Sequence, residues 1–279
     1  MSKDTEPSSR SDAPTLQANK DFGGVYRLMR RTSKVRADRL MVDRGLAETR
    51  ERAQALIMEG VVYTSVDRIQ KPGTLVGDNV EIEVRGRLPF VSRGGTKLNH
   101  ALENFSIDVN RLVTLDVGAS TGGFTDCLLQ RGANKVYAVD VGRGQIDYKL
   151  RTDDRVEVIE KTNARFPFPL PEKVDLITID VSFISLTMVI PPVIEHLAFG
   201  RNVVALVKPQ FEAKKEKVGK GGIIKDPKVH AAVLGSMVNW AVGSGLRLRN
   251  ICRSPILGDA GNREFFVLLE KPINVHANT

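Results

Sequence analysis

The 279-residue sequence has only two cysteines, Cys127 and Cys252, and only one tryptophan. Two cysteines cannot form the disulfide network that stabilises many small secreted proteins, so we expect a reducing compartment, the cytoplasm. Long hydrophobic runs are also missing, because no apolar stretch approaches the roughly 18 residues that a membrane-spanning helix needs. The four histidines are scattered without the spacing of metal ligands. The sequence therefore predicts neither a membrane-spanning segment nor a metal site.

Acidic residues are outnumbered, since the chain carries 41 Lys and Arg against 33 Asp and Glu, a formal net charge of +8. A surplus of positive charge suits a polyanionic partner, most simply a nucleic acid. Residues 34–87 are nearly balanced, with ten basic and nine acidic side chains. The surplus is carried instead by residues 20–39, 85–97 and 214–228, which predicts that a nucleic acid follows a path between these segments and binds with salt-sensitive affinity.

The composition divides the chain into four parts. Residues 1–33 begin rich in Ser, Pro and Asp and end in a basic run, and are predicted to form a disordered basic tail. Residues 34–84 have the pattern of a small α+β module. Residues 85–93 form a predicted linker, within a stretch, 85–97, that has four basic residues, three glycines and no acidic residue. Residues 94–279 are expected to form a larger domain.

The small module is predicted from two helical patterns and two short alternating runs. Apolar residues spaced over 35–46 predict an amphipathic helix that ends at Gly45, and a second helix is expected from Thr49 to Gly60. Residues 61–63 and 80–84 are predicted strands. A module of this size buries little surface and is only modestly stable on its own, so we expect it to serve for binding.

In the larger domain, apolar strand-like runs alternate with helical stretches. Seven strands are expected, at residues 113–117, 135–140, 155–160, 174–180, 202–207, 246–253 and 265–270. This alternation predicts an α/β fold with a mostly parallel, doubly wound sheet.

A glycine-rich loop is the most informative segment of this domain. Residues 115–125, LDVGASTGGFT, follow an apolar strand and open a helix, the setting in which glycine lets a cofactor approach the backbone. The spacing G-x-x-x-G-G lacks the second glycine of a dinucleotide fingerprint and the Gly-Lys-Ser/Thr of a P-loop. Asp140 ends the next strand, 22 residues after Gly118. A carboxylate there can accept hydrogen bonds from both hydroxyls of an adenosine ribose.

Together these features fit S-adenosylmethionine (SAM), with Asn163 after the third strand able to address the adenine. The alternative is a tight strand–helix turn followed by a solvated aspartate. The residues expected to hold the cofactor are Asp116, Gly118, Ser120, Thr121, Gly122, Gly123, Phe124, Asp140, Asn163 and Asp180.

Three polar residues, Asp180, Lys208 and Glu264, stand at the ends or beginnings of predicted strands. Ligands of open α/β sheets bind outside the carboxyl ends of the strands. A lysine directly after the apolar run VVALV is a poor choice for packing alone. Any one of the three could cap the sheet in a salt bridge, but all three behind a SAM-like loop predict a catalytic site.

At this point the sequence resembles a known family. The motifs SRGGTKL (92–98), LDVGASTGGFTD (115–126), DVSFISL (180–186), LVKPQFE (206–212) and SPILGDAGNREFF (254–266) occur in the order found in the TlyA-type, haemolysin A-like rRNA 2′-O-methyltransferases, which are similar to the FtsJ/RrmJ methyltransferases. The sequence differs from the family pattern at one position of the predicted linker: the best-known relatives have a tryptophan where this chain has Phe90.

The resemblance implies that Lys97, Asp180, Lys208 and Glu264 form the family's K-D-K-E catalytic tetrad. It also implies a Rossmann-like SAM-dependent methyltransferase domain with a seven-stranded, mostly parallel sheet, joined to an RNA-binding domain of the ribosomal-protein-S-four type. The implied partner is ribosomal RNA within ribosomal subunits, at cytidine 2′-hydroxyls of the small subunit, the large subunit or both. Residues expected to contact RNA are Lys34, Arg36, Arg39, Arg50, Arg93, Lys214 and Lys215.

Methyl transfer to a ribose hydroxyl is an in-line displacement at a sulfonium, so the enzyme must align three atoms and help the hydroxyl lose its proton. Lys208 is expected either to take that proton or to stabilise the forming alkoxide. Nearby Asp180 and Glu264 favour a charged lysine, whereas Lys97 and desolvation favour a neutral one. The sequence leaves both roles open.

Three other functions are less consistent with the sequence. A haemolysin needs a membrane-inserting or strongly amphipathic segment, and none stands out. An RNA-binding protein with an inactive methyltransferase domain would not need the intact tetrad. A base methyltransferase is expected to show an Asn/Asp-Pro-Pro-Tyr/Phe-like motif or a catalytic cysteine, whereas this chain has DVSF at residues 180–183.

Overall fold

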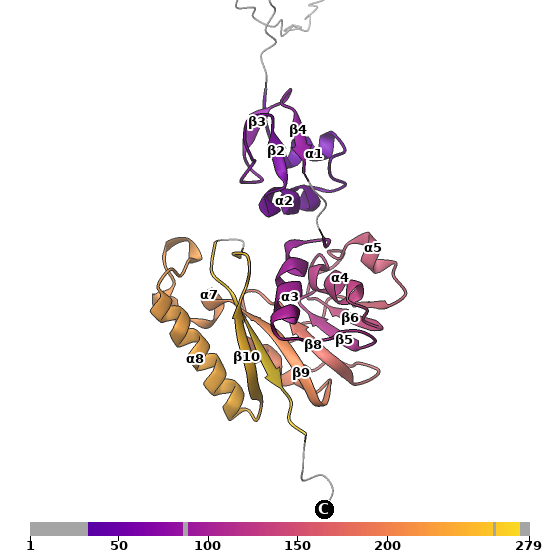
Figure 1. The fold of residues 1–279 in the computed structure, drawn as a ribbon, viewed down its shortest axis with the longest axis vertical. Coiled ribbons are helices and arrows are strands. Elements are labelled where there is room, and N and C mark those ends of the chain that lie inside the picture. The colour runs from indigo at the N-terminus through magenta and orange to yellow at the C-terminus, as the bar shows by residue number, and fades with distance from the viewer. Residues whose placement is uncertain (1–32, 86–88, 259–260, 274–279) are drawn as a thin grey trace, which may run out of the picture.

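The structure is a computed structural model that describes residues 33–85, 89–258 and 261–273 (Figure 1). The tail predicted for residues 1–33 lies outside the described residues, except for Ser33. A small module of two helices and four short strands precedes a larger α/β domain, and helix α2 of the module lies on the side that faces this domain.

The small module consists of β1 (Lys34–Arg36), α1 (Ala37–Asp43), α2 (Arg50–Glu59), β2 (Val62–Thr64), β3 (Leu75–Gly77) and β4 (Ile82–Val84). Its strands pair antiparallel in two short ladders, β1 with β3 and β2 with β4. Its apolar side chains form a separate small core in which Met41 and Ile57 are almost completely buried.

The boundaries of the module's helices follow from local chemistry. The Thr49 side chain accepts a hydrogen bond from the backbone N–H of Arg52 and so caps α2, and Gly60 ends that helix in the left-handed conformation at φ 78°. The prediction for the first helix was wrong at its start. Val35 lies in β1, and α1 begins only at Ala37, because the backbone of residues 34–36 pairs with β3. A three-residue strand is too short to show an alternating pattern.

The larger domain contains thirteen described elements and two short 3₁₀ turns. They are α3 (Arg93–Asn104), β5 (Val113–Val117), α4 (Gly123–Gln130), β6 (Lys135–Val139), α5 (Tyr148–Arg151), β7 (Val156–Ile159), β8 (Val174–Ile179), α6 (Leu186–Ile194), β9 (Leu197–Val207), α7 (Pro209–Glu212), the 3₁₀ turns Lys215–Lys217 and Lys220–Gly222, α8 (Pro227–Gly243), β10 (Arg247–Arg253) and β11 (Phe265–Glu270).

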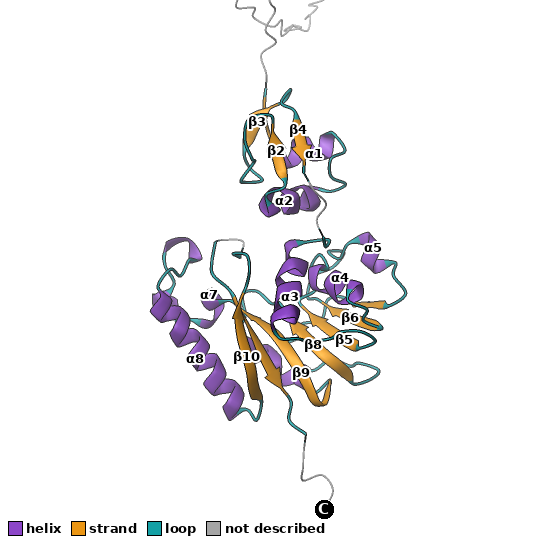
Figure 2. Cartoon of the chain, viewed as in Figure 1, coloured by secondary structure: helices purple, strands orange, loops and turns teal. Residues whose placement is uncertain are grey.

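The seven strands of this domain form one sheet in the order β10-β11-β9-β8-β5-β6-β7, drawn in orange in Figure 2. The strands β9, β8, β5, β6 and β7 run parallel, and only β11 runs against its two neighbours, β9 and β10. The predicted mostly parallel α/β sheet is thereby confirmed. Strand β9 begins at Leu197, earlier than expected, because Leu197 already pairs with Val174 at the start of β8.

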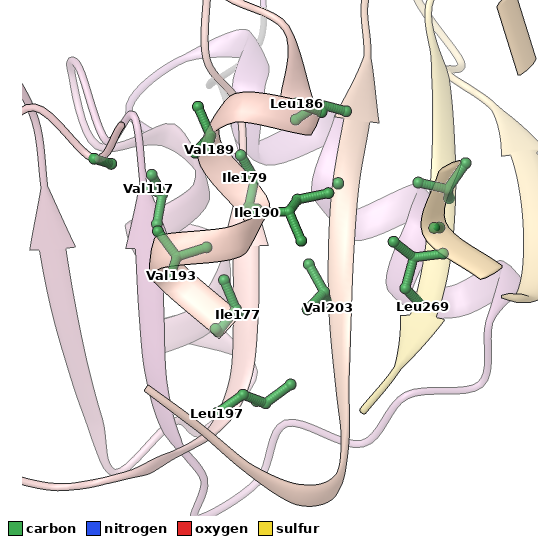
Figure 3. Close-up of a cluster of buried hydrophobic side chains, with 14 of the residues drawn as sticks. Val117, Ile177, Ile179, Leu186, Val189, Ile190, Val193, Leu197, Val203 and Leu269 are labelled. Atoms are coloured by element: carbon green, nitrogen blue, oxygen red, sulfur yellow. The ribbon is translucent and has the colours of Figure 1, made fainter. Parts of the chain in front are cut away.

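Helices cover both faces of the sheet, as a parallel sheet requires. Helices α6 and α8 pack on one face, where Ile190 and Val193 of α6 lie over Ile177 and Ile179 of β8 (Figure 3). Helices α3, α4 and α5 pack on the other face. Each fully buried side chain of this size stabilises the fold by roughly 1.5–3 kcal/mol. The carboxyl ends of the central strands therefore project from a well-packed platform.

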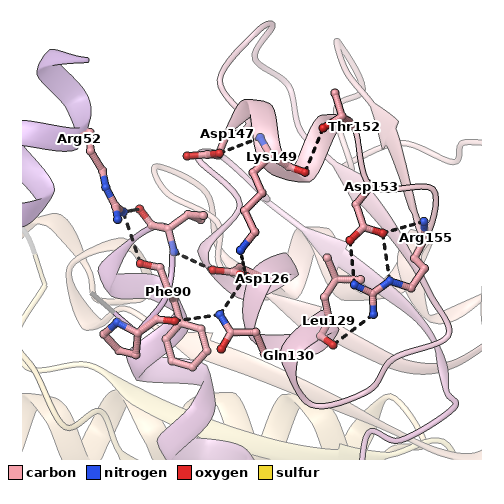
Figure 4. Close-up of polar contacts among 12 residues, drawn as sticks. Arg52, Phe90, Asp126, Leu129, Gln130, Asp147, Lys149, Thr152, Asp153 and Arg155 are labelled. Atoms are coloured by element: carbon pink, nitrogen blue, oxygen red, sulfur yellow. Dashed lines mark hydrogen bonds and ion pairs between the residues drawn. The ribbon is translucent and has the colours of Figure 1, made fainter. Parts of the chain in front are cut away.

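Phe90 and Val91, just before the larger domain, are held by hydrogen bonds from both parts of the chain (Figure 4). Arg52 of α2 donates hydrogen bonds to the carbonyl oxygens of Phe90 and Val91, and the backbone N–H of Val91 donates to the Asp126 carboxylate of α4 at 2.8 Å. The Phe90 ring is buried against Gly95. Helix α3 starts at Arg93, so residues 93–97, whose composition resembles a linker, form its first turn.

No helix in the described part of the chain combines the length and the apolar character that crossing a bilayer demands.

Candidate methyl-transfer site

The site lies beside β5, at the point in the sheet where the order of the strands reverses. Strand β5 is flanked by β6 and β8, so the loop after β5 and the loop after β8 leave the sheet side by side, at the position where open α/β sheets bind ligands. Gly118 follows β5 with φ 84°, and a Cβ at this position would lie 2.4 Å from the carbonyl oxygen of Asp180. Only glycine allows the two loops to approach this closely.

A cavity of about 530 Å³ opens beside this loop, a volume in the range of small-molecule sites. Its rim includes Asp140, whose two carboxylate oxygens accept hydrogen bonds from the backbone N–H groups of Ser120 at 2.8 Å and Gly142 at 2.6 Å. Each carboxylate oxygen has a second lone pair. Asp140 can therefore accept further hydrogen bonds from a ligand without giving up its own.

The predicted cofactor residues divide into three groups. Gly118, Ser120, Asp140, Asn163 and Asp180 line the 530 Å³ cavity. Thr121, Gly123 and Phe124 line the neighbouring cavity described below. Asp116 and Gly122 line neither of the two.

Gly122 and Asp116 support the loop from behind. Gly122 has φ 93°, and a Cβ there would lie 2.2 Å from Leu150. Asp116 is fully buried and accepts hydrogen bonds from the hydroxyls of Thr125 at 2.7 Å and Thr178 at 3.2 Å. Burial raises the pKa of the Asp116 carboxyl to about 7. Its place behind the loop suits a structural role.

A second cavity, of about 320 Å³, contains all four residues of the expected tetrad. They form two ion pairs. Lys97 Nζ lies 2.6 Å from Glu264 Oε2, and Lys208 Nζ lies 2.6 Å from Asp180 Oδ1. Lys97 and Glu264 are buried, whereas Lys208 and Asp180 retain some exposure. Four ionisable side chains in two pairs provide both donors and acceptors for a hydroxyl group.

The two cavities share a wall. Gly118, Ser120, Asp180 and Ser182 line both of them. A group bound beside the glycine loop and a group bound against the tetrad would therefore meet across these four residues. Transfer of a group between two ligands needs this arrangement.

Comparison with known proteins agrees with this geometry. Residues 90–271 match the FtsJ-like methyltransferases. The chain belongs to this family. YqxC of Bacillus subtilis is 48% identical over 86% of this chain and 87% of its own length. The 16S/23S rRNA (cytidine-2′-O)-methyltransferase TlyA of Mycobacterium tuberculosis is 42% identical over 85% of this chain and 90% of its own length. A solved haemolysin structure from Streptococcus thermophilus has 45% identity and a TM-score of 0.69, covering 86% of this chain and 89% of its own.

Several residues that line the cavities of the FtsJ-like domain were missed by sequence reasoning. Ser182 lies in both cavities, and Gln145 and Arg165 line the larger one. Gln54 and Met58 of helix α2 line the tetrad cavity from the small module. Ser182 could have been found from its motif, two residues after Asp180. Nothing in the sequence signals that α2 faces the FtsJ-like domain.

The residues predicted to contact RNA are not gathered in one place, and their role remains a prediction. In the small module, Arg36 and Arg50 both pair with Asp38, at 2.8 Å and 3.0 Å, and Gln54 donates to the same carboxylate at 3.0 Å. Asp38 is fully buried, and the Arg36 guanidinium holds the pKa of its carboxyl well below the usual range. The guanidinium groups are thus fixed at the module's surface.

The other predicted RNA contacts lie apart from this cluster. Lys34 is exposed on β1, and Arg39 is exposed with Asp43 at 3.8 Å. Arg93 begins α3 and lines the tetrad cavity. Lys214 and Lys215 are exposed in the segment after α7. Within the described residues, no three His, Cys, Asp or Glu side chains come together as a metal site would require.

Proposed function

We propose that this chain transfers a methyl group from S-adenosylmethionine to a ribose 2′-hydroxyl of ribosomal RNA, with cytidine as the modified nucleotide. The observation that carries the proposal is the wall shared by the glycine-loop cavity and the cavity of the Lys97–Glu264 and Lys208–Asp180 pairs. The kinship with TlyA of Mycobacterium tuberculosis, named for cytidine 2′-O-methylation, supports the same substrate.

The residues beside Gly118 fit the cofactor. The loop has no Cβ where it passes the Asp180 carbonyl, and the cavity has the volume of a small-molecule site. Asp140 would hold the ribose hydroxyls. Asn163 would address the adenine, since its amide oxygen accepts from the Arg165 N–H at 3.1 Å and its amide nitrogen has no partner among the described residues. When bound, SAM supplies an electrophilic methyl group.

The four tetrad residues would bind the acceptor hydroxyl. In the reaction an O–C bond forms at the ribose oxygen, the C–S bond breaks and the hydroxyl proton is lost. Lys208 faces the shared wall together with Asp180 and can either accept this proton or stabilise the negative charge on the oxygen. Lys97 and Glu264 are buried in the wall of the same cavity and would hold its shape and charge balance.

The small module and the loop after α7 would bind the RNA. Arg36 and Arg50, fixed by Asp38, suit phosphate oxygens because a guanidinium can donate several hydrogen bonds in a set geometry. RNA affinity is expected to fall steeply as salt rises. A salt-independent affinity would contradict this assignment. A ribosomal substrate also agrees with the cytoplasmic location that the cysteine content predicts.

The experiment is methyl transfer with the full chain, radiolabelled SAM and ribosomal subunits that lack the modification, followed by mapping of 2′-O-methyl positions on both rRNAs. Lys208→Ala is expected to bind SAM, measured by calorimetry, but to lose transfer. Lys173→Ala, just before the amino end of β8 and so at the end of the sheet away from the site, is the matched control and keeps wild-type transfer. SAM binding without any transfer by the wild type would instead support an RNA-binding protein with an inactive domain.

A further inference from the structure

Lys208 is held by two oxygen atoms from one short segment. Its Nζ lies 2.6 Å from Asp180 Oδ1 and donates a hydrogen bond to Ser182 Oγ at 2.9 Å. Asp180 and Ser182 follow β8, whereas Lys208 follows the adjacent strand β9. The lysine therefore bridges two neighbouring strand ends through two contacts rather than one.

The two contacts together fix the orientation of the Lys208 amine, which one contact alone would leave free. An ion pair with Asp180 sets the distance of the amine but allows the amine to rotate about its Cε–Nζ bond. The hydrogen bond to Ser182 stops this rotation, whereas Asp180 Oδ1 is paired with the amine by charge and distance and makes no hydrogen bond with it. The directions of the other two positions on the nitrogen are thereby set: both are N–H donors in the ammonium form, and one is a lone pair in the neutral amine. In both forms a defined group would face a ligand in the cavity.

We propose that Ser182 is a positioning residue for methyl transfer, acting by orienting the Lys208 amine; this inference rests on the proposed function. The hydroxyl lines both cavities at the shared wall, and Lys208 is its one hydrogen-bond partner among the described residues. Ser185, three residues on, differs. Its hydroxyl accepts from the Thr187 N–H and donates to Glu212, which is the pattern of a helix cap.

The distance between Ser182 and Lys208 is fixed by a second connection between the same segments. Glu212, in the short helix α7 directly after Lys208, accepts hydrogen bonds from the Ser185 hydroxyl at 2.6 Å and the Leu186 N–H at 2.8 Å. Gly118 contacts the backbone of Asp180 from the other side. The segment from Asp180 to Leu186 is thus held against the segment from Lys208 to Glu212 independently of the lysine.

The test compares Ser182→Ala, Ser182→Thr and Ser185→Ala in the full chain, with SAM and ribosomal subunits as substrates. Ser182→Ala is expected to lower kcat by about tenfold, the effect of one lost hydrogen bond to a charged group. KM for SAM stays within about twofold of wild type, and Ser182→Thr, which keeps the hydroxyl, recovers most of kcat. Ser185→Ala lowers the melting temperature by removing a cap but keeps the hydrogen bond from the Leu186 N–H to Glu212, so it lowers kcat less than Ser182→Ala does.

A crystal structure of Ser182→Ala gives a readout that needs no RNA. Lys208 is expected to occupy more than one conformer there and a single conformer in Ser182→Thr. Wild-type kcat in Ser182→Ala, or a single unchanged Lys208 conformer, overturns the inference. Absence of rRNA methylation by the wild-type protein defeats the proposed function instead, and the conformers of Lys208 still decide the role of Ser182.

Discussion

Lys97 and Glu264 are 167 residues apart in the chain, and their side chains meet with 2.6 Å between Nζ and Oε2. Both are buried, so each neutralises a charge that would otherwise be isolated in the protein interior. The pair also joins α3, the first helix of the FtsJ-like domain, to the residue directly before β11, its last strand.

Removing one member of this pair is expected to cost more stability than removing both. Lys97→Met leaves Glu264 buried without a partner and is expected to lower the free energy of unfolding by about 3–5 kcal/mol. The double variant Lys97→Met/Glu264→Leu recovers most of this loss, because no charge remains to be desolvated. Urea unfolding of Lys97→Met, Glu264→Leu and the double variant measures how strongly the two side chains depend on each other. A double variant that loses as much stability as the two single variants together would contradict this expectation. As a control, Arg85→Ala breaks an exposed pair with Glu83 and costs less than about 1 kcal/mol.

Gly118→Ala is expected to weaken SAM binding at least tenfold, since the new Cβ would lie 2.4 Å from the Asp180 carbonyl oxygen and must push the two loops apart. Gly245→Ala is the matched control, because Gly245 has a similar φ of 81° but open space around its Cα. This control is expected to cost about 1–2 kcal/mol of stability from backbone strain and to leave SAM affinity unchanged. Calorimetric titration with SAM compares Gly118→Ala with Gly245→Ala. Equal SAM affinities of the two variants would show that the close approach of Gly118 to Asp180 is unimportant for SAM binding.

The stability of the protein is expected to depend on pH through Asp116, whose pKa burial raises to about 7. Because the folded state holds this proton more tightly than the unfolded state, the stabilisation is complete below pH 4 and is lost as the pH rises through 7. The rise of the Asp116 pKa from its ordinary value to about 7 corresponds to roughly 4 kcal/mol in the free energy of unfolding.

Asp116→Asn removes the titration and keeps partners for Thr125 and Thr178. Urea unfolding at pH 5.5 and pH 8.5 is expected to show a smaller loss of stability with rising pH in this variant than in the wild type. Parallel pH dependence of the two proteins would mean that Asp116 titrates at its ordinary value.

Asp38→Asn is expected to weaken RNA binding about tenfold and to destabilise the small module, because hydrogen bonds from Arg36 and Arg50 to a charged acceptor are lost. Asp67→Asn changes an exposed carboxylate in the same module and serves as the control. Filter binding to rRNA fragments at several salt concentrations measures the effect. Unchanged affinity in a folded Asp38→Asn variant would show that RNA does not use the two fixed arginines.

The sheet could be predicted from the sequence because buried parallel strands are continuous apolar runs, and six of the seven began within about two residues of the expected position. The exception, β9, starts with Leu197-Ala198-Phe199, which Gly200, Arg201 and Asn202 separate from the apolar run VVALV, so that only the pairing with β8 joins the two parts into one strand. Strands β1 and β3 were missed because Val35 fits the helical spacing and because it is their pairing with each other, not an alternating pattern, that defines them.

Within the site, the strand-end rule found Asp180, Lys208 and Glu264 without any relative. Lys97 could be recognised only through its motif, since it lies on a helix, where no such rule applies. The partners of the charged residues were beyond prediction. That Arg36 and Arg50 meet at Asp38, or that Lys208 meets Ser182, depends on distances that the order of residues does not contain.

The direction of β11 determines how Glu264 reaches the site. Because β11 runs against β9, its first residues, and not its last, lie beside the Lys208 end of the sheet. Asp180 and Lys208 are therefore presented as the chain leaves the sheet, and Glu264 as it enters. Glu264 directly precedes Phe265, which pairs with Val207, and its carbonyl oxygen accepts a hydrogen bond from the Ser254 N–H at 2.9 Å, so the register of β11 sets where this carboxylate stands. A one-residue insertion within the connection after Ser254 would therefore leave the acid in place, whereas a one-residue slip of β11 would carry it away from both lysines.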